Sequence, residues 1–545
     1  MKRAMLIALA FAGCGRAGPD PPAPWFEEVA RSRGLVFEYR SGHAKRYLFP
    51  EIMGGGAALF DMDGDGDLDA YLVQGGSLTG PRAAQPGNRL FRNRGDGTFE
   101  DATAGSGAED GGYGMGVAAG DYDNDGDVDL YVTHVGPNLL LRNEGGGRFV
   151  DVTSRAGVGH PGWTTSAAFV DYDRDGDLDL FAANYVRWSP QADIECFNNL
   201  QQPDYCSPRT YQAPAMDVLY RNDGDGRFTD VTEALGLGAA FGNGLGVAAA
   251  DFDGDGWPDL FVANDGTLNQ LWINQQGRGF VDQALLRGCA SDQEGLAKAG
   301  MGVSVADIDD DLDLDLLIGN LNAESDSLFR NSGRFFSDAT AGAGLGLASR
   351  SFTRFGLGWI DFDNDGRLDL FEANGRVMMQ ASSVGPDPFA EPSLVFQATA
   401  EGRFVERLPR GGTAAPLAAT SRAAAFGDVD NDGGVDILVV NRDAPAYLLH
   451  NVVAPRGHWI AFRVLEEHGR DAEGAQLVLS VAGHRRRRDV RAGYSYCASN
   501  DPRVHVGLGA ATRVDDVSVR WVDGELESFG AFDADRIVEL RRGRR

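Results

Sequence analysis

Short apolar stretches alternate with polar turns along most of the chain. Around residues 61 to 69 the sequence runs "GGAALF", then "DMDGDGDLD", then "AYLVQG", and a similar order returns around residues 121 to 129. Apolar runs rich in β-branched and aromatic residues on both sides of a tight turn predict a β-hairpin. A second hairpin follows each loop, with an Asn-x-Gly turn, as in "LFRNRGDGTFEDAT" at 90–103. Each repeat is therefore expected to contain four strands.

The acidic loop recurs seven times at intervals of 50 to 80 residues, starting at Asp61, Asp121, Asp171, Asp251, Asp307, Asp361 and Asp428. Four-stranded repeats of this length are typical of β-propellers, which commonly have about 4–8 blades. We therefore predict an all-β fold in which residues 25–454 form a seven-bladed β-propeller. The longest interval contains an irregular insertion, residues 185–215.

The two ends of the repeat region complement each other. A strand with the pattern Phe-x-Asp/Glu follows each of the first six loops, but none follows the seventh. The missing strand occurs instead before the first loop, as "WFEEVARSRGL" from Trp25. We expect this N-terminal strand to be the outermost strand of the seventh blade, because closing the ring removes exposed sheet edges.

The pattern changes after the repeats. Residues 455–545 contain alternating strands such as "HWIAFRVLEE", "AQLVLSVAGH" and "DVSVRWVDG", without acidic loops. This alternation predicts a small C-terminal β-sandwich.

Charge is concentrated in the repeated loops. The formal net charge is -30, and the seven nine-residue loops alone contain 33 Asp and 2 Arg. The acidity is therefore local and does not indicate a disordered acidic tail. Binding to nucleic acid is not expected, because the carboxylates would repel the phosphates.

The chain begins with features of an exported protein. "MKRAMLIALAFAGCG" has two basic residues, a short apolar run and small residues before Cys14. This order predicts a lipoprotein signal peptide at 1–13, lipidation of Cys14 and a Pro/Gly-rich tether at 14–24. The alternative is an ordinary cleaved signal. We expect an outer-membrane or cell-surface lipoprotein, or otherwise a secreted or periplasmic protein, that contacts the membrane only through Cys14.

Four further cysteines remain. Cys196 and Cys206 lie ten residues apart in the insertion, and in an exported protein this spacing favours a disulfide. Cys289 and Cys497 are either buried thiols or a long-range bridge, and we favour free thiols.

The loops have the chemistry of calcium sites. Aspartates at positions 1, 3 and 5, glycine at position 6, the carbonyl of position 7 and aspartate at position 9 provide an oxygen cage suited to Ca²⁺. The alternative is a solvated aspartate turn without a cation, but seven loops in register favour the metal. Up to seven Ca²⁺ are expected. Leu312 replaces the glycine of the fifth loop, so the occupancy of 307–315 stays open. The predicted ligand residues, loop by loop, are Asp61, Asp63, Asp65, Asp67 and Asp69; Asp121, Asp123, Asp125, Asp127 and Asp129; Asp171, Asp173, Asp175, Asp177 and Asp179; Asp251, Asp253, Asp255, Trp257 and Asp259; Asp307, Asp309, Asp311, Asp313 and Asp315; Asp361, Asp363, Asp365, Arg367 and Asp369; and Asp428, Asp430, Asp432, Gly434 and Asp436.

These loops resemble the FG-GAP/VCBS calcium repeats of integrin α-type propellers. The whole chain resembles the cartilage acidic protein-like family, which joins such a propeller to an ASPIC/UnbV domain. The resemblance is carried by "YLFPEIMGGGAALFDMDGDGDLDAYLVQGG", "YCSPRTYQAPAMDVLYRNDGDGRFTDVT", "AKAGMGVSVADIDDD", "RDAEGAQLVLSV" and "YCASNDPRVHVGLG". It implies secretion, calcium-stabilised folding and a role in binding or adhesion, and it supplies no catalytic residues.

No established catalytic motif is present, such as GxSxG, HExxH or a Walker loop. His505 is expected to be a packed residue rather than a base. The basic run "HRRRRD" at 484–489 is either a patch for anionic glycans or lipid headgroups or, as we favour, a solvated strand and turn.

We predict a surface recognition or adhesion module for an extracellular or envelope glycan or protein ligand. The alternatives are a carbohydrate-active enzyme, either a polysaccharide lyase or a hydrolase, on the same scaffold, and a structural subunit of an envelope complex. The aromatic-rich insertion is a candidate binding loop, with inter-blade packing as an equal alternative. Its candidate ligand contacts are Tyr185, Arg187, Trp188, Tyr205 and Tyr211.

Overall fold

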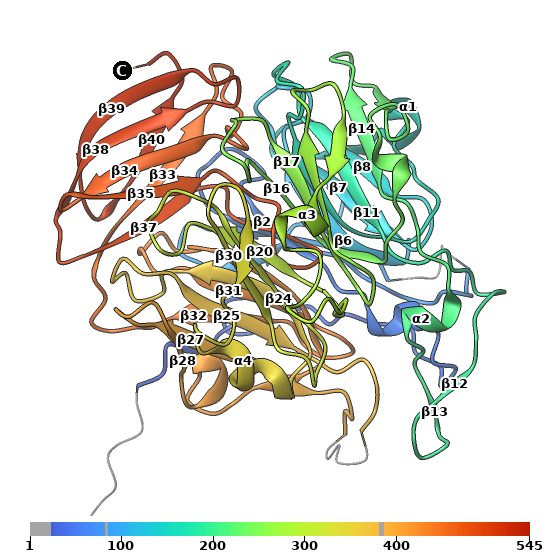
Figure 1. Cartoon of the computed structure of the whole chain (residues 1–545). Helices are drawn as coiled ribbons and strands as arrows, with labels where there is room; N and C mark the ends of the chain where they lie inside the picture. The colour runs from blue at the N-terminus through green and yellow to red at the C-terminus, as the bar shows by residue number, and fades with distance from the viewer. Residues whose placement is uncertain (1–22, 82–85, 381–385, 545) are drawn as a thin grey trace, which may run out of the picture.

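Seven four-stranded antiparallel units form the main body of the protein (Figure 1). The computed structural model describes residues 23–81, 86–380 and 386–544. This architecture confirms the predicted all-β propeller class. Listed from the innermost strand outward, the blades are β2 (Ala57–Phe60), β3 (Asp69–Leu72), β4 (Arg89–Asn93) and β5 (Phe99–Asp101); β6 (Gly114–Gly120), β7 (Asp129–His134), β8 (Leu139–Asn143) and β9 (Phe149–Asp151); β10 (Thr164–Val170), β11 (Asp179–Asn184), β14 (Val218–Asn222) and β15 (Phe228–Asp230); β16 (Gly244–Ala250), β17 (Asp259–Asn264), β18 (Gln270–Asn274) and β19 (Phe280–Asp282); β20 (Val303–Ala306), β21 (Asp315–Ile318), β22 (Ser327–Asn331) and β23 (Phe336–Asp338); β24 (Arg354–Ile360), β25 (Asp369–Asn374), β27 (Leu394–Ala398) and β28 (Phe404–Glu406); and β30 (Ser421–Gly427), β31 (Asp436–Asn441), β32 (Tyr447–Asn451) and β1 (Phe26–Glu28).

The first and last segments of the propeller meet in the seventh blade. β1 pairs antiparallel with β32, with Phe26 opposite Asn451. An apolar core also joins blade 7 to blade 1, with Leu438 and Val440 packed in the same cluster as Leu59 and Leu72. Similar clusters fill the spaces between the other neighbouring blades. Packing therefore runs continuously around the ring.

The C-terminal region, which we call the cap, is a sandwich of two sheets. One sheet has the order β37 (Val504–Gly509), β33 (His458–Leu465), β40 (Arg536–Arg541). The other has the order β35 (His484–Asp489), β34 (Gln476–Val481), β38 (Arg513–Arg520), β39 (Leu526–Asp533). Apolar side chains between them form a separate core around the buried Trp521.

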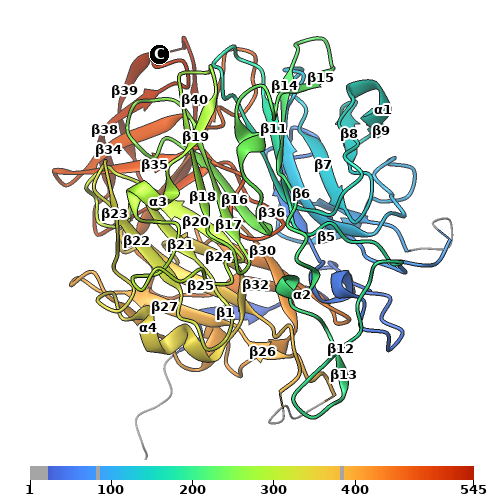
Figure 2. The same cartoon turned by 45° about the vertical axis from the view of Figure 1, so that its right-hand side comes forward.

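One cap segment enters the centre of the propeller. β36 (Ala498–Ser499) pairs in parallel with β2, and Figure 2 shows it among the innermost strands. Ser495 exchanges backbone hydrogen bonds with Val303 of blade 5, at 2.7 and 3.0 Å. The Tyr496 hydroxyl donates to the Met53 carbonyl at 2.8 Å. The cap therefore fills part of the channel with its own chain.

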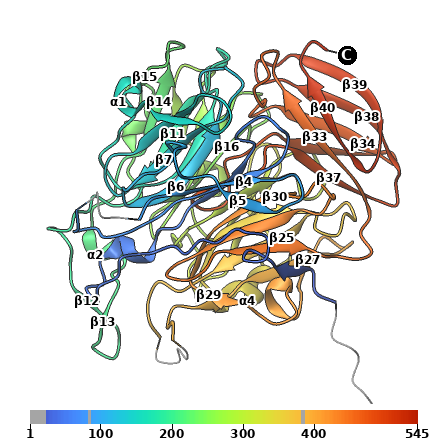
Figure 3. The ribbon, with the colours of Figure 1, turned by 180° about the vertical axis from the view of Figure 1, so that it is seen from behind.

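The helices are short: α1 (Thr153–Ala156), α2 (Pro208–Tyr211), α3 (Ala284–Arg287) and α4 (Leu345–Ala348). Among the described residues, no helix has the length and apolar character needed to cross a membrane. Two small ribbons, β12 (Cys196–Phe197) with β13 (Pro203–Asp204), and β26 (Glu391–Pro392) with β29 (Ala418–Ala419), lie outside the blades. The β12–β13 hairpin projects from the end of the molecule opposite the cap (Figures 1 and 3).

Candidate metal centres

Each acidic loop joins the innermost strand of a blade to the second strand. In the first loop the Asp61 carboxylate accepts hydrogen bonds from Gly64 N at 2.8 Å and Gly66 N at 3.1 Å. Asp65 accepts from Asp67 N at 3.0 Å. The glycine at position 6 has a left-handed backbone, with φ of 91° at Gly66. This turn brings alternate carboxylates to one side of the loop.

Carboxylate oxygens of the same loop lie close enough together to bind one hard cation such as Ca²⁺. In the first three loops, oxygens of the first, third and closing aspartates lie within 4.8 Å of one another, as in Asp61, Asp63 and Asp69. In the fourth loop the set is Asp251, Asp253 and Asp255. In the seventh it is Asp430, Asp436 and His450, the last of which the sequence did not suggest. The fifth-position aspartates are exposed at the loop surfaces, apart from the half-buried Asp365.

Buried carboxylate oxygens that lack a hydrogen-bond partner support calcium as the ion that these loops fit. Among the described residues, a buried oxygen without a hydrogen-bond partner occurs on Asp63, Asp123, Asp173 and Asp430 at position 3, and on Asp171 and Asp251 at position 1. Burial also raises the pKa of Asp69 to about 7 and that of Asp361 to about 8. Buried carboxylates with free oxygens are the ligands that Ca²⁺ prefers. The residues present therefore fit this cation.

The closing aspartate has a structural role that the sequence pattern did not reveal. Asp69 accepts from Met62 N at 2.9 Å and from Asn93 N at 2.7 Å, one bond on each oxygen. The equivalent pair of bonds occurs in all seven loops. Because a carboxylate oxygen has two lone pairs, these bonds leave room for a metal. The closing aspartate thus ties its loop to the third strand of the blade.

An asparagine on that third strand then ties neighbouring loops together. Asn143 Nδ2 donates to the Met62 carbonyl of the preceding loop at 2.8 Å and to the Val128 carbonyl of its own loop at 3.2 Å. The sixth blade has Ala398 at this position. The recurring asparagine at the start of the second turn, preceded by arginine in four blades, was the available sequence signal. The same two contacts are made by Asn93, Asn222, Asn274, Asn331 and Asn451.

The fifth loop differs in having Leu312 at the glycine position, and like several other loops it has arginine partners. Leu312 adopts a φ of 78°, which a leucine disfavours, so the turn is kept at a cost in backbone strain. Arg330 lies 3.0 Å from Asp309 and 2.8 Å from Asp315. Arg487 donates to the Leu312 carbonyl at 3.1 Å. Arginines therefore supply positive charge at this loop.

The cap covers the face that carries the loops. Arg463 lies 3.1 Å from Asp61, and Gln476 donates to Asp251 at 3.0 Å. Arg503 donates to the Asp428 carbonyl at 2.9 Å. At the sixth loop, a Cβ on Gly507 would lie 2.0 Å from Asp361 Oδ2, so only glycine permits this approach.

The contacts between the cap and the acidic loops test two expectations from the sequence, one about residues 484–489 and one about His505. The basic run 484–489 is neither a glycan patch nor, beyond its exposed first two residues, a solvated turn. Arg487 and Arg488 contact the fifth loop. His505 is packed against Trp459 and lies 3.2 Å from the Gly433 carbonyl, and burial lowers its pKa to about 4. Its packed location agrees with the prediction.

The insertion is held by a disulfide between Cys196 and Cys206, with 5.3 Å between their Cα atoms. Cys289 and Cys497 are free and buried. Tyr185 and Tyr205 are also buried, so their rings offer no exposed surface to a ligand, contrary to the expectation; the Tyr205 hydroxyl belongs to a polar group described below. Both pack in the aromatic cluster that closes the channel, where Tyr185 donates to Asp265 at 2.6 Å.

The other three candidates of the insertion retain some exposure. Arg187 is exposed, and Trp188 and Tyr211 are half-buried. Trp188 Nε1 and the Tyr211 hydroxyl both donate to Asp193, at 2.8 and 2.9 Å. The predicted signal peptide and the lipidation site Cys14 lie outside the described residues.

A compact group of titratable side chains lies on the face away from the cap. His43 Nδ1 is 2.8 Å from Glu51, and both contact the Tyr205 hydroxyl, at 3.1 and 3.3 Å. Arg442 donates to the same hydroxyl at 3.2 Å. No sequence signal indicated this group, because Tyr205 and Arg442 lie far along the chain from His43 and Glu51.

Comparison with known proteins matches both parts of the chain. The FG-GAP-like repeat model matches residues 61–132, 130–182, 202–262 and 251–318, and the ASPIC and UnbV model matches residues 466–545. Cartilage acidic protein 1 of Xenopus tropicalis is 26% identical over 310 residues, which cover 55% of this chain and 44% of that protein. The human protein is 31% identical over 178 residues, covering 31% of this chain and 26% of that protein. The matches thus span less than half of these relatives.

Solved structures with similar folds are more distant. An Agrocybe aegerita lectin that recognises non-reducing terminal N-acetylglucosamine is 16% identical, with a TM-score of 0.37, over 72% of this chain and 86% of that chain. Saccharomyces cerevisiae Sqt1 is 11% identical, with a TM-score of 0.39, over 76% and 98%. The two domain matches and their order along the chain agree with the resemblance found in the sequence: FG-GAP-like repeats are followed by an ASPIC and UnbV domain, and the chain is similar to cartilage acidic protein 1 over part of its length.

Proposed function

We propose that this protein is an exported, calcium-stabilised propeller that recognises a glycan or protein ligand through the face opposite the cap. The family's combination of domains is typical of extracellular adhesion or recognition proteins. The observation that carries the proposal is the contrast between the two faces. The cap packs on the face that carries the acidic loops, whereas the opposite face bears a disulfide-held hairpin with exposed apolar side chains.

The hairpin has the surface properties of a contact site. Ile194, Phe197 and Leu200 are 39%, 53% and 59% exposed. Their exposed polar neighbours are Asn199, Gln201 and the charged Glu195, so the apolar side chains lie within a polar rim. Exposed apolar residues grouped within a polar rim mark interaction sites more often than isolated ones do.

Calcium has a structural part in this proposal. The aspartates at positions 1, 3, 5 and 9 and the carbonyl at position 7 would hold the ion, with up to seven ions per chain and the fifth loop the least suited. The bound ion would supply positive charge that offsets carboxylate repulsion. The loops would thereby become rigid joints between the two inner strands of each blade.

The cellular location that we propose rests on the N-terminal sequence. Lipidation of Cys14 would hold the protein at an outer membrane or cell surface, and cleavage without lipidation would release it. The membrane is proposed to contact only the lipid, and no nucleic-acid partner is proposed.

The test uses protein beginning at Gly15, which lacks the lipidation site. It is applied to arrays of polysaccharides and extracellular proteins, in calcium and in chelator. We expect retention in calcium, and at least a tenfold loss for Phe197→Ser/Leu200→Ser. The matched control is Phe335→Ser/Leu526→Ser, which removes side chains that are 51% and 64% exposed elsewhere. Equal retention by the two double variants would argue against the hairpin as the ligand-binding surface.

The His43 group favours a second candidate, a carbohydrate-active enzyme. A carboxylate-oriented histidine beside a tyrosine and an arginine is a plausible acid–base arrangement for cleaving a polysaccharide. Every retained polysaccharide is therefore assayed for new reducing ends and unsaturated products. Product formation that is lost in His43→Gln would favour the enzyme, and retention without product would favour the binder.

A further inference from the structure

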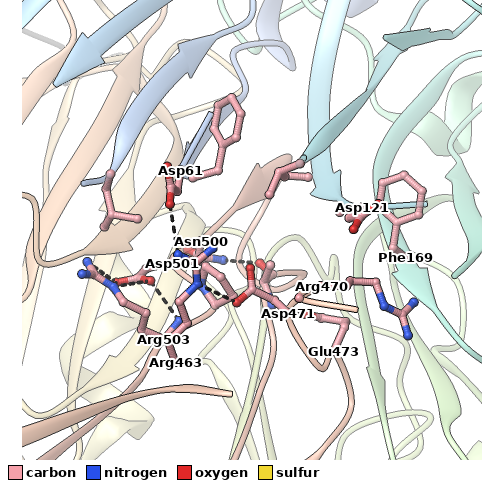
Figure 4. Close-up of a pocket in the computed structure, with 18 of the residues that line it drawn as sticks. Asp61, Asp121, Phe169, Arg463, Arg470, Asp471, Glu473, Asn500, Asp501 and Arg503 are labelled. Carbon is pink, nitrogen blue, oxygen red and sulfur yellow. Dashed lines mark hydrogen bonds and ion pairs between the residues drawn. The ribbon is translucent and has the colours of Figure 1, made fainter. Parts of the chain in front are cut away.

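A second site lies where the cap meets the first three blades. A cavity of about 110 Å³ is enclosed between the first two acidic loops and the cap (Figure 4). Its walls are largely apolar and include Phe60, Leu68, Phe169, Leu178 and Ile537. An apolar cavity of about 150 Å³ holds benzene, so this smaller space suits an organic molecule of only a few heavy atoms.

Most charged groups around this cavity already have partners. Arg463 lies 3.1 Å from Asp61 and 3.4 Å from Asp471. Arg503 lies 2.9 Å from Asp501. Both carboxylate oxygens of Glu473 accept from Ala492 N, at 3.0 and 3.1 Å. These groups hold the cap in place and leave little capacity for a ligand.

Arg470 is different. Its side chain lines the cavity, and the residue is only 6% exposed. Neither Nε nor Nη1 has a hydrogen-bond partner among the described residues. Figure 4 places it below Asp121 and Phe169, on the side away from Arg463 and Arg503. Buried N–H groups without an acceptor are costly, so Nε and Nη1 are available to an acceptor on a ligand.

We propose that this cavity binds a small carboxylate with an apolar body, and that Arg470 is its anchor. The planar guanidinium presents paired donors that match a carboxylate. The apolar walls would cover the rest of the molecule, as in most small-molecule sites. The commonest arrangement of such sites, a few polar groups among apolar walls, is present here.

The nearest opposing charges belong to the acidic loops. The positive charge of Arg470 opposes the rise in pKa that burial causes at Asp121 and Asp171, the first aspartates of the second and third loops. Without a cation these carboxylates would repel a ligand carboxylate, and calcium in the two loops would offset that repulsion. The inference therefore rests on the calcium binding proposed above, and ligand affinity should be higher in calcium than in chelator.

The experiment is calorimetric titration of calcium-loaded protein beginning at Gly15. Acetate and propionate are the test ligands, and propionamide is the neutral control. We expect saturable binding of one or both carboxylates and at least tenfold weaker binding of propionamide. Arg470→Gln should lower carboxylate affinity at least tenfold. Arg513→Gln, an exposed cap arginine, should leave it unchanged.

A second variant guards against misfolding of Arg470→Gln. Ala119→Leu narrows the cavity from the propeller side and should weaken binding while leaving Arg470 intact. Absence of saturable binding by either carboxylate would overturn the proposal and indicate a cavity that holds only water. Equal affinity of Arg470→Gln and the parent would do the same. Calcium is counted in the same samples by native mass spectrometry, so a failure of the metal proposal is recorded separately.

Discussion

At the scale of single residues, the asparagine of the third strand connects neighbouring acidic loops. Asn143 is fully buried, and its side-chain amide satisfies carbonyls from two different blades. Six blades have this asparagine, and the exception, Ala398, would face the fifth loop, which is also the loop with Leu312 in place of glycine. The boundary between blades 5 and 6 therefore lacks both the inter-blade asparagine and the loop glycine found at the other boundaries.

Asn143→Ala should destabilise the protein by about 1–3 kcal/mol, because it removes the two side-chain hydrogen bonds to the carbonyl oxygens of Met62 and Val128, of which Met62 keeps Gly147 N as a donor. Asn199→Ala, at an exposed position of the hairpin, should change stability by less than about 0.5 kcal/mol. Urea denaturation of both variants in calcium measures the difference. A change at Asn143 no larger than that at Asn199 would show that the inter-blade contact is unimportant.

At the scale of elements, the N-terminal strand completes the seventh blade. Phe26 is fully buried and packs against Phe362 at 5.1 Å and Phe371 at 6.4 Å between ring centroids. Both partners belong to the sixth blade region, so one side chain of β1 secures two blades. Without β1, the edge of β32 would be exposed to pairing with other chains.

Phe26→Ala should cost about 3–5 kcal/mol, as truncation of a buried phenylalanine usually does. Glu27→Ala is the matched control, since Glu27 is exposed on the same strand. Thermal unfolding and light scattering follow stability and aggregation together. A loss of stability for Phe26→Ala as small as that for Glu27→Ala would contradict the role of β1 in completing the seventh blade.

The elements were predictable because their signals are local. Alternation of apolar and polar residues gives the hairpins, and "WFEEVARSRGL" contains the same strand pattern that follows the first six loops. The position of the cap was not predictable, because it depends on pairs such as Arg463 and Asp61 that are 402 residues apart. Burial of Tyr185 and Tyr205 was missed for a related reason: aromatic residues in an irregular insertion are compatible with both a surface and a core.

At the scale of the whole molecule, the propeller and the cap share one interface. Arginines of the cap meet the acidic loops, and residues around β36 occupy the channel between the inner strands. While the cap is seated, this part of the channel is filled and the loop face is exposed only at parts of the loops such as the fifth-position aspartates. The recognition that we propose would use the opposite face, and the proposed carboxylate would use the cavity beside Arg470.

Calcium binding by the loops is the central claim, and counting the ions tests it most directly. Metal-free protein beginning at Gly15 is titrated with calcium, and bound ions are counted by native mass spectrometry while the thermal midpoint is followed. We predict six or seven ions, with about 2.7 kcal/mol gained per loop when calcium is at a hundred times its Kd. Asp173→Asn, which alters an aspartate with an unpaired oxygen, should lose one ion, and Asp515→Asn on the exposed cap surface should lose none. Binding of no ion, or binding without any rise in the midpoint, would contradict the account.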